Sequence, residues 1–185
     1  DQPVLLEVAR FFNTALCHTD HVQCYACFCE NSPMVTQELM RILSGSTNVD
    51  LLKQTAELTY TLMSLDEKDT CFCSLFADVD FVSSVVEASR ELGYEHETSG
   101  QNYVMEVFHY FTTYEAGVLA IENILEQIAE ANTLYLKILC HSLILSNNTE
   151  IITTIIATLD HIFCRHLMVR IGLMSSPSFI HAVLK

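Results

Sequence analysis

The sequence has no tryptophan and only five glycines and three prolines among its 185 residues. This scarcity fits helices throughout the chain and fits β-sheets poorly. Basic residues are also few, because nine Lys and Arg stand against 23 Asp and Glu, which gives a net charge of −14. Since phosphate backbones are bound by clustered Lys and Arg, this balance argues against DNA or RNA as the partner and favours a basic or neutral one.

Long apolar runs and targeting signals are missing as well. The longest apolar stretch, 134–145, is interrupted by Lys137 and His141. No run reaches the ~18 uninterrupted residues that a membrane helix needs, and no secretory leader opens the chain. Eight cysteines in a chain of this length fit reduced thiols better than a disulfide scaffold. We therefore expect an intracellular protein, cytoplasmic or nuclear, with residues 1–185 forming one domain of a longer chain.

What the sequence does contain is helical periodicity. Apolar residues make up 50% of the chain and charged residues 17%, which predicts an ordered core. In the first helix, a single inward stripe is expected from Leu5, Val8, Phe12 and Leu16. A short segment is expected over 70–77 and a polar loop over 93–100. The helices predicted from the pattern are 4–17, 21–30, 34–43, 48–65, 81–92, 101–112, 115–130, 133–145, 148–164, 165–174 and 178–185.

One of these helices returns 100 residues later. The stretch 48–63 reads NVDLLKQTAELTYTLM, and 148–163 reads NTEIITTIIATLDHIF. Each copy is followed by a phenylalanine-led piece, 81–86 and 179–184. A pattern that repeats in the same order indicates a stacked helical array, and such arrays usually bind other chains.

In the order and spacing of its helices the chain resembles the armadillo repeat, a three-helix unit whose third helix lines a concave groove. The resemblance implies an all-α, right-handed α-solenoid of about three and a half irregular repeats. The third helices would be 4–17, 48–65, 101–112 and 148–164. Three features of the family differ here. The tight Gly turn is absent, and the first helix of the third unit, 115–130, is longer than usual. The position of the peptide-holding Asn is occupied by Ala15, Thr61, Tyr110 and His161.

The binding site is predicted to lie on the concave surface, which the third helices would line. On helix 48–65 the inward stripe is Leu51, Leu52, Thr55, Leu58 and Leu62, and the other face is polar and aromatic. The positions equivalent to this outer face lie 49 and 100 residues further on in the sequence. A second candidate patch is the aromatic cluster over 103–114, although we expect most of its side chains to lie in the core. The predicted partner-binding residues are Lys53, Glu57, Tyr60, Thr61, Tyr103, Glu106, His109, Tyr110, Tyr114, Asp160 and His161.

A cluster of cysteines and histidines lies between residues 17 and 29. Cys24 and Cys27 have the spacing of a zinc knuckle, but the second ligand pair that a zinc site needs is absent. On one helix, Cys17, His21 and Cys24 would share a face, so we expect packed thiols between helices and no metal. The strings that mark nucleotide, hydrolase and metalloprotease sites are also absent, which predicts no enzyme and no cofactor.

We therefore expect a scaffold or adaptor that holds a helical or extended, basic and apolar segment of a partner protein. Apolar faces at the two ends of the array would invite neighbouring repeats, a capping partner or self-association. Two alternatives remain open. One is a homodimerisation module, and the other is a compact helical bundle that binds a small apolar ligand in its core.

Overall fold

A computed structural model describes residues 2–18, 21–66, 71–76, 78–94, 98–113 and 177–184, with isolated positions between 149 and 175. Within these residues the secondary structure is entirely helical, which confirms the all-α prediction. The helices are α1 (Gln2–Cys17), α2 (His21–Glu30), α3 (Ser32–Gly45), α4 (Val49–Leu65), α5 (Cys73–Phe76), α6 (Val79–Tyr94), α7 (Thr98–Thr113) and α12 (Pro177–Leu184). The helices predicted over 115–130 and 133–145 lie outside the described residues, as do most of 148–164 and 165–174.

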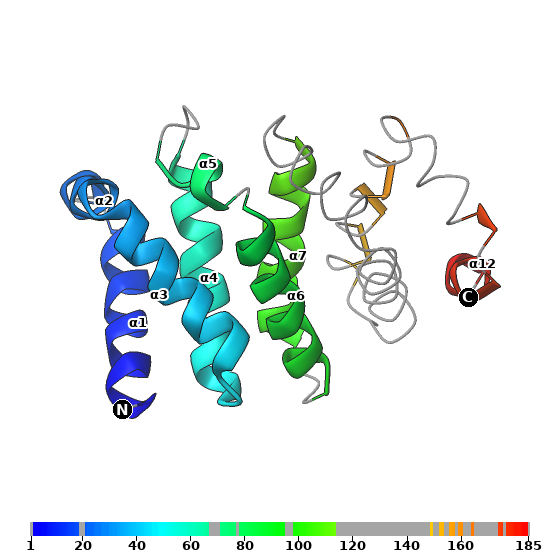
Figure 1. Cartoon of the computed structure of the whole chain (residues 1–185), viewed down its shortest axis with the longest axis horizontal. Helices are drawn as coiled ribbons and strands as arrows, with labels where there is room; N and C mark the ends of the chain where they lie inside the picture. Colours follow the sequence, from blue (N-terminus) through cyan, green and yellow to red (C-terminus); the bar gives the residue numbers. More distant parts are fainter. Residues whose placement is uncertain are drawn as a thin grey trace.

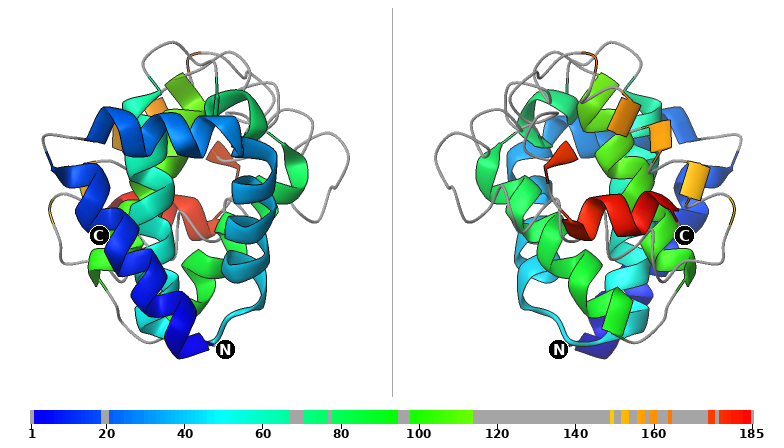
Figure 2. Two further views of the ribbon diagram at one scale, coloured as in Figure 1. Left: turned by 90° about the vertical axis from the view of Figure 1, so that its left-hand side faces the viewer. Right: turned by 90° about the vertical axis from the view of Figure 1, so that its right-hand side faces the viewer.

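The helices form two layers. In one layer α4 packs between α1 and α7, and in the other α3 packs against α6 (Figure 1). End-on, the two layers face each other, and α2 crosses from α1 to α3 along one edge (Figure 2). Helices α1 and α12 lie at opposite ends of the long axis (Figure 1). None of the described helices is both long enough and apolar enough to span a lipid bilayer.

Helix α4 is the centre of the described core. Its predicted inward stripe is confirmed, because Leu51, Leu52, Thr55, Leu58 and Leu62 are all buried. The Thr55 hydroxyl donates to the main-chain oxygen of Leu51 at 2.7 Å, so this polar group is satisfied inside its own helix. Ala56, Thr59 and Met63 are buried as well, whereas the predicted binding residues of α4 are only half-buried.

The connection from α4 to α6 is held by a buried carboxylate and a phenylalanine cluster. Asp66 ends α4 and accepts hydrogen bonds from the main-chain N–H groups of Cys71 (3.1 Å) and Phe72 (2.7 Å). Phe72, Phe76 and Phe81 are fully buried. The rings of Phe76 and Phe81 are stacked, with centroids 4.2 Å apart and an interplanar angle of 11°. The short helix α5 is thus held in place by its own Phe76, which packs on Phe72 before it and on Phe81 of α6.

The predicted inward stripe of α1 is wrong at Val8, which is 43% exposed. The residues of α1 that are buried are Ala9, Asn13 and Leu16. The buried line is turned toward these positions because α4 and α2 are the described helices that cover α1. The polar residue Asn13 is therefore buried between α1 and α4, whereas the apolar residue Val8 is exposed.

The predicted loop over 93–100 is shorter than expected. Helix α6 continues to Tyr94 and α7 begins at Thr98, so both helices extend into the polar stretch. Gly100 is buried inside α7, and a Cβ added there would lie 2.9 Å from Cδ2 of Leu92. This glycine permits a close approach of α7 to α6, and its role is in packing rather than in a turn.

Two further local predictions are corrected. Asp80 lies in the first turn of α6, and the side chain of Asp78 accepts from the Asp80 N–H at 2.9 Å. Asp78 therefore caps α6, which begins at Val79 and not at residue 81 as predicted. Cys17 ends α1 and His21 begins a new helix, so Cys17, His21 and Cys24 do not share one helix face.

Candidate functional site

The structure brings six of the predicted binding residues onto neighbouring helices. We call them the α4–α7 strip: Lys53, Glu57, Tyr60 and Thr61 of α4, with Tyr103 and Glu106 of α7. All six are half-buried, so each presents part of its side chain to the surface. Because α4 and α7 pack side by side, residues more than 40 positions apart in the sequence form one continuous surface.

Two tyrosines form the middle of the strip. The rings of Tyr60 and Tyr103 lie with their centroids 5.8 Å apart at an interplanar angle of 39°. This separation is typical of an aromatic pair in contact. The tilted rings join α4 to α7 while leaving part of their surface exposed, and they have a polar hydroxyl at one end.

Each tyrosine has a carboxylate from the opposite helix nearby. Burial raises the pKa of Tyr103, and Glu57 of α4 raises it further by its charge and by accepting from the phenol. Burial also raises the pKa of Tyr60, with a further contribution from the charge of Glu106 on α7. Both phenols therefore remain neutral at physiological pH, and the strip consists of two tyrosine–carboxylate pairs that cross between the helices.

A hydrogen-bond chain links this strip to α1. The Asn13 Nδ2 atom donates to the main-chain oxygen of Gln54 (2.9 Å) and to its Oε1 (3.1 Å). The Gln54 Nε2 atom then donates to Oε2 of Glu57 at 3.2 Å. Glu57 is thus oriented by a chain of neutral amides that begins in the buried α1–α4 interface. Sequence reasoning missed Asn13 and Gln54, although a lone Asn among the apolar residues of α1 was a usable signal.

Two other strip residues are engaged within the protein. The Thr61 hydroxyl donates to the main-chain oxygen of Glu57 at 2.9 Å, one turn earlier in α4. Lys53 lies where α4 meets the start of α7, since a Cβ added at Gly100 would be 3.4 Å from the Lys53 Cβ. Lys53 also has an interaction of its own. Tyr60 and Glu106 likewise have further interactions, and what the strip presents at its surface is two half-buried rings, two half-buried carboxylates and Lys53.

The other predicted binding residues are not joined to the strip by the described contacts. His109 and Tyr110 belong to α7, but their side chains lie outside the described part, as do Tyr114 and His161 entirely. Asp160 is an exposed helical residue in the C-terminal part of the chain. The extension of the strip toward 148–164 remains a prediction.

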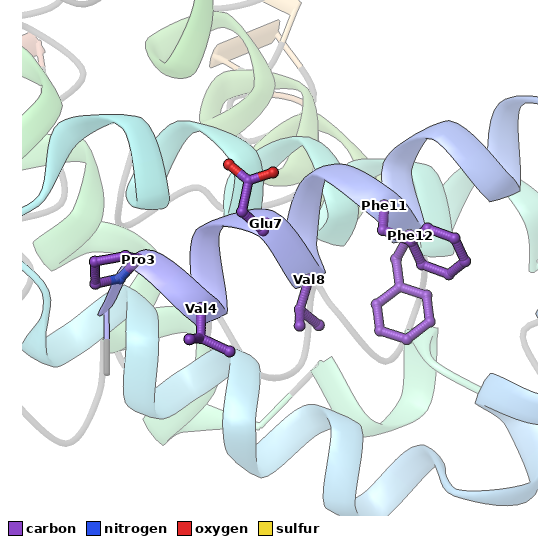
Figure 3. Close-up of a pocket in the computed structure, with 6 residues that line it drawn as sticks. All are labelled: Pro3, Val4, Glu7, Val8, Phe11 and Phe12. Atoms are coloured by element: carbon purple, nitrogen blue, oxygen red, sulfur yellow. The ribbon is translucent and has the colours of Figure 1, made fainter.

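A second surface lies on α1. Val4 and Phe11 are strongly exposed, with Phe11 at 67%, and both line an open apolar hollow on α1 (Figure 3). The residues that line the hollow are Pro3, Val4, Glu7, Val8, Phe11 and Phe12. Phe12 turns away to pack edge-on against Phe28 of α2, with ring centroids 4.8 Å apart. An apolar face at the N-terminal end of the array was predicted, and the exposure of α1 agrees with it.

The cysteines of α2 face a different environment. Burial raises the pKa of Cys29 to about 11, with a further contribution from hydrogen bonding to Cys71. Burial also raises the pKa of Cys24, with Cys27 adding to it. These two thiols are therefore protonated at neutral pH, which disfavours metal binding and nucleophilic attack. Within the described residues, no three or more Cys, His, Asp or Glu side chains gather as metal ligands do.

Comparison with known proteins shows which family the chain is similar to. A family profile described as the SAAL1 C-terminal domain matches residues 35–185. The chain is 28% identical over 169 residues to Protein saal1 of Xenopus tropicalis, covering 82% of this chain and 36% of that protein. It is 28% identical over 160 residues to Protein SAAL1 of Mus musculus, covering 76% and 33%, and 25% identical over 168 residues to Protein SAAL1 of Homo sapiens, covering 82% and 35%.

The chain thus spans about a third of the length of these curated relatives. No solved structure gave a significant match. The family profile covers well over half of the chain, including the α4–α7 strip. The protein belongs to the SAAL1 C-terminal domain family.

Proposed function

We propose that this domain is a protein-interaction module of the scaffold or adaptor type. It holds a helical or extended segment of a partner protein, basic and apolar in character, across the α4–α7 strip. The observation that supports the proposal is the crossed arrangement of Tyr60 and Tyr103 with Glu106 and Glu57 on two adjacent helices. Tyrosine is enriched among the residues that dominate protein interfaces, and carboxylates add orientation and faster association with basic segments.

We further propose that the two layers belong to an armadillo-like solenoid. Helices α2, α3 and α4 would form one three-helix unit, α5, α6 and α7 the next, and α1 the last helix of a preceding unit. The supporting contacts are those of equivalent helices, since α1, α4 and α7 pack in sequence and α3 packs on α6. In such a stack the third helices line the surface that takes the partner.

An intracellular setting, cytoplasmic or nuclear, is part of this proposal. The six cysteines whose side chains are described are all free thiols. Free thiols persist in a reducing compartment, where most adaptor domains of this kind would meet their partners.

The proposal is tested by placing a photo-cross-linking amino acid, p-benzoylphenylalanine, at Thr61 within the strip. The matched control has the same amino acid at Arg90, an exposed position of α6 in the other layer. Irradiation in cell extract, followed by mass spectrometry of the adducts, should give discrete partner peptides from Thr61 that are absent from Arg90. Equal adducts from both positions, or none from Thr61, would contradict docking on the strip.

A second candidate function is homodimerisation, which the exposed apolar face of α1 favours. A twofold dimer buries the same patch of both subunits, so one apolar face is sufficient. Sedimentation velocity over a dilution series tests it with the Phe11→Glu variant. A dimer in the parent protein that becomes a monomer in the variant would support this function, and a monomer in both would remove it.

A further inference from the structure

We propose that the α4–α7 strip contains a subsite for one arginine side chain of the partner segment, formed by the Tyr60 and Tyr103 rings and the Glu57 carboxylate. This inference rests on the proposed function, because it names the residue type that the strip recognises. Glu57 and Tyr60 come from α4 and Tyr103 from α7, so the subsite exists only where these two helices pack.

The pairing of the other glutamates provides the first argument. Three described arginines each form an ion pair with the glutamate three residues earlier in the same helix: Glu7 with Arg10, Glu38 with Arg41, and Glu87 with Arg90. Glu57 is also a helical glutamate, but the residue three positions after it is Tyr60. An aromatic ring thus stands where the other helices supply a guanidinium.

The hydrogen bonds of Glu57 provide the second argument. Its carboxylate accepts from the Gln54 amide at 3.2 Å and lies close enough to the Tyr103 phenol to raise the pKa of that group, and both of these neighbours are neutral donors. Neutral donors fix the orientation of a carboxylate without cancelling its charge. Glu57 is also half-buried, so water screens that charge less than on a fully exposed helix face. A cation from outside the chain would complete the site.

The tyrosine rings select the kind of cation. A guanidinium is planar, weakly hydrated and able to donate two parallel hydrogen bonds to a carboxylate while its face lies on an aromatic ring. An ammonium group is more strongly hydrated and gains less from stacking. Two rings with centroids 5.8 Å apart beside a carboxylate therefore fit arginine better than lysine.

The surrounding charges permit this occupant. Lys53 lies one turn before Glu57, and Glu106 lies across the strip on α7, so Lys53, Glu57 and Glu106 sum to one negative charge. Lys53, Tyr60 and Glu106 each have a further interaction within the protein, so the subsite depends on Glu57 for its charge and uses only the half-buried surface of the Tyr60 ring. The net charge of −14 adds a long-range attraction for a basic segment.

An NMR titration of the whole chain with Nα-acetyl-arginine amide tests the subsite. The observed signals are the ring resonances of ¹³C-labelled Tyr60 and Tyr103, assigned with single Tyr→Phe variants. We expect saturable shifts with the arginine compound, weaker binding of the lysine analogue, and no saturable shift with the uncharged citrulline analogue. Equal shifts with citrulline would overturn the assignment, because that compound keeps the shape without the charge.

Two variants sharpen the result. Glu57→Gln should weaken arginine binding about tenfold or more, since it removes a charge-assisted bidentate contact. Glu38→Gln, on the surface of α3, should leave binding unchanged. Tyr60→Leu removes one ring, keeps an apolar side chain, and should also weaken binding. Unchanged affinity in both Glu57→Gln and Tyr60→Leu would overturn the subsite.

Failure of the subsite and failure of the proposed function give different results. If the cross-linked partner peptides at Thr61 persist in the Glu57→Gln variant and the arginine compound does not bind, the docking function stands and the arginine subsite is wrong. If no partner is cross-linked at Thr61, the docking function itself is wrong, whatever the arginine compound does.

Discussion

Replacement of Asn13 by aspartate is the most informative single change in the described core. Asn13 is 5% exposed, and its Nδ2 atom donates to two oxygens of Gln54 at 2.9 and 3.1 Å. An ionised carboxylate at this position would donate no hydrogen bond and would face two acceptor oxygens. A buried charge left without compensation costs about 3–5 kcal/mol, so we expect Asn13→Asp to lose about that much stability at neutral pH.

The alanine variant should behave differently. Asn13→Ala also loses both donated hydrogen bonds, at about 1 kcal/mol each. However, it removes the buried Oδ1 atom of Asn13, which has no hydrogen-bond partner in the structure. Relief of such an orphaned acceptor is worth about 1–3 kcal/mol, so the two effects nearly cancel. We therefore expect Asn13→Ala to cost about 1 kcal/mol or less, far less than Asn13→Asp.

Urea unfolding followed by circular dichroism measures both variants, with Thr14→Asp as the control. Thr14 is the exposed neighbour of Asn13 in α1, and an acid there should change stability by about 0.5 kcal/mol or less. Burial would raise the pKa of the carboxyl introduced by Asn13→Asp, so the loss should be small below about pH 4 and grow as the pH rises. Equal stability of Asn13→Asp and Thr14→Asp at pH 7 would refute the buried amide contact.

Three further predictions concern the helices around the strip. Gly100→Ala would bring a Cβ to 2.9 Å from the buried Leu92 side chain and should cost about 1–3 kcal/mol in urea, whereas Gly45→Ala meets nothing within 4 Å and should be neutral or slightly stabilising. Equal effects would contradict the close approach of α6 and α7. Asn48→Ala removes the side chain that caps α4 by accepting from the Leu51 N–H at 3.0 Å, so it should lower the free energy of unfolding by about 1 kcal/mol. Asn48→Ser also has a capping oxygen and should keep most of that stability. An Asn48→Ala variant as stable as the parent would argue against the cap. The pKa of Tyr103 is raised in the folded protein, so its neutral phenol contributes stability that is complete below about pH 10 and is lost as the pH rises through the folded pKa. The urea midpoint of the parent protein should therefore fall above about pH 10, and it should fall less steeply in Tyr103→Phe. An unchanged decline would show that Tyr103 is not held neutral by burial and Glu57.

The sequence predicted the elements better than their contacts. Helical spacing identified the buried stripe of α4, from Leu51 to Leu62, because that helix is covered on both sides within its layer. The same reasoning was wrong for Val8, since an apolar stripe shows which face prefers burial but not which neighbour covers it. The polar stretch 93–100 suggested a loop, yet Gly100 serves the packing of two helices. Such contacts depend on tertiary distances that periodicity does not encode.

The candidate site could be predicted in part. Periodicity placed Glu57 and Tyr60 on the outer face of α4, and a shift of 49 residues placed Glu106 on the equivalent face of the next long helix. The pairing of Tyr60 with Tyr103 depends on the relative register of α4 and α7, which no local pattern specifies. The amide chain from Asn13 was missed for the same reason, because it joins side chains 41 positions apart.

Binding of the partner segment to tyrosine-depleted protein is the most direct test of the central claim. The segment captured by the cross-linker at Thr61 would be synthesised and its Kd measured by calorimetry with the parent chain, with Tyr60→Ala/Tyr103→Ala, and with Phe11→Ala as a control on α1. We expect at least about a tenfold rise in Kd for the double variant, since tyrosine anchors commonly contribute 1.4 kcal/mol or more, and no change for the control. The thermal midpoints would be followed in parallel to show that each variant is folded. An unchanged Kd in a folded Tyr60→Ala/Tyr103→Ala variant would contradict docking on the α4–α7 strip.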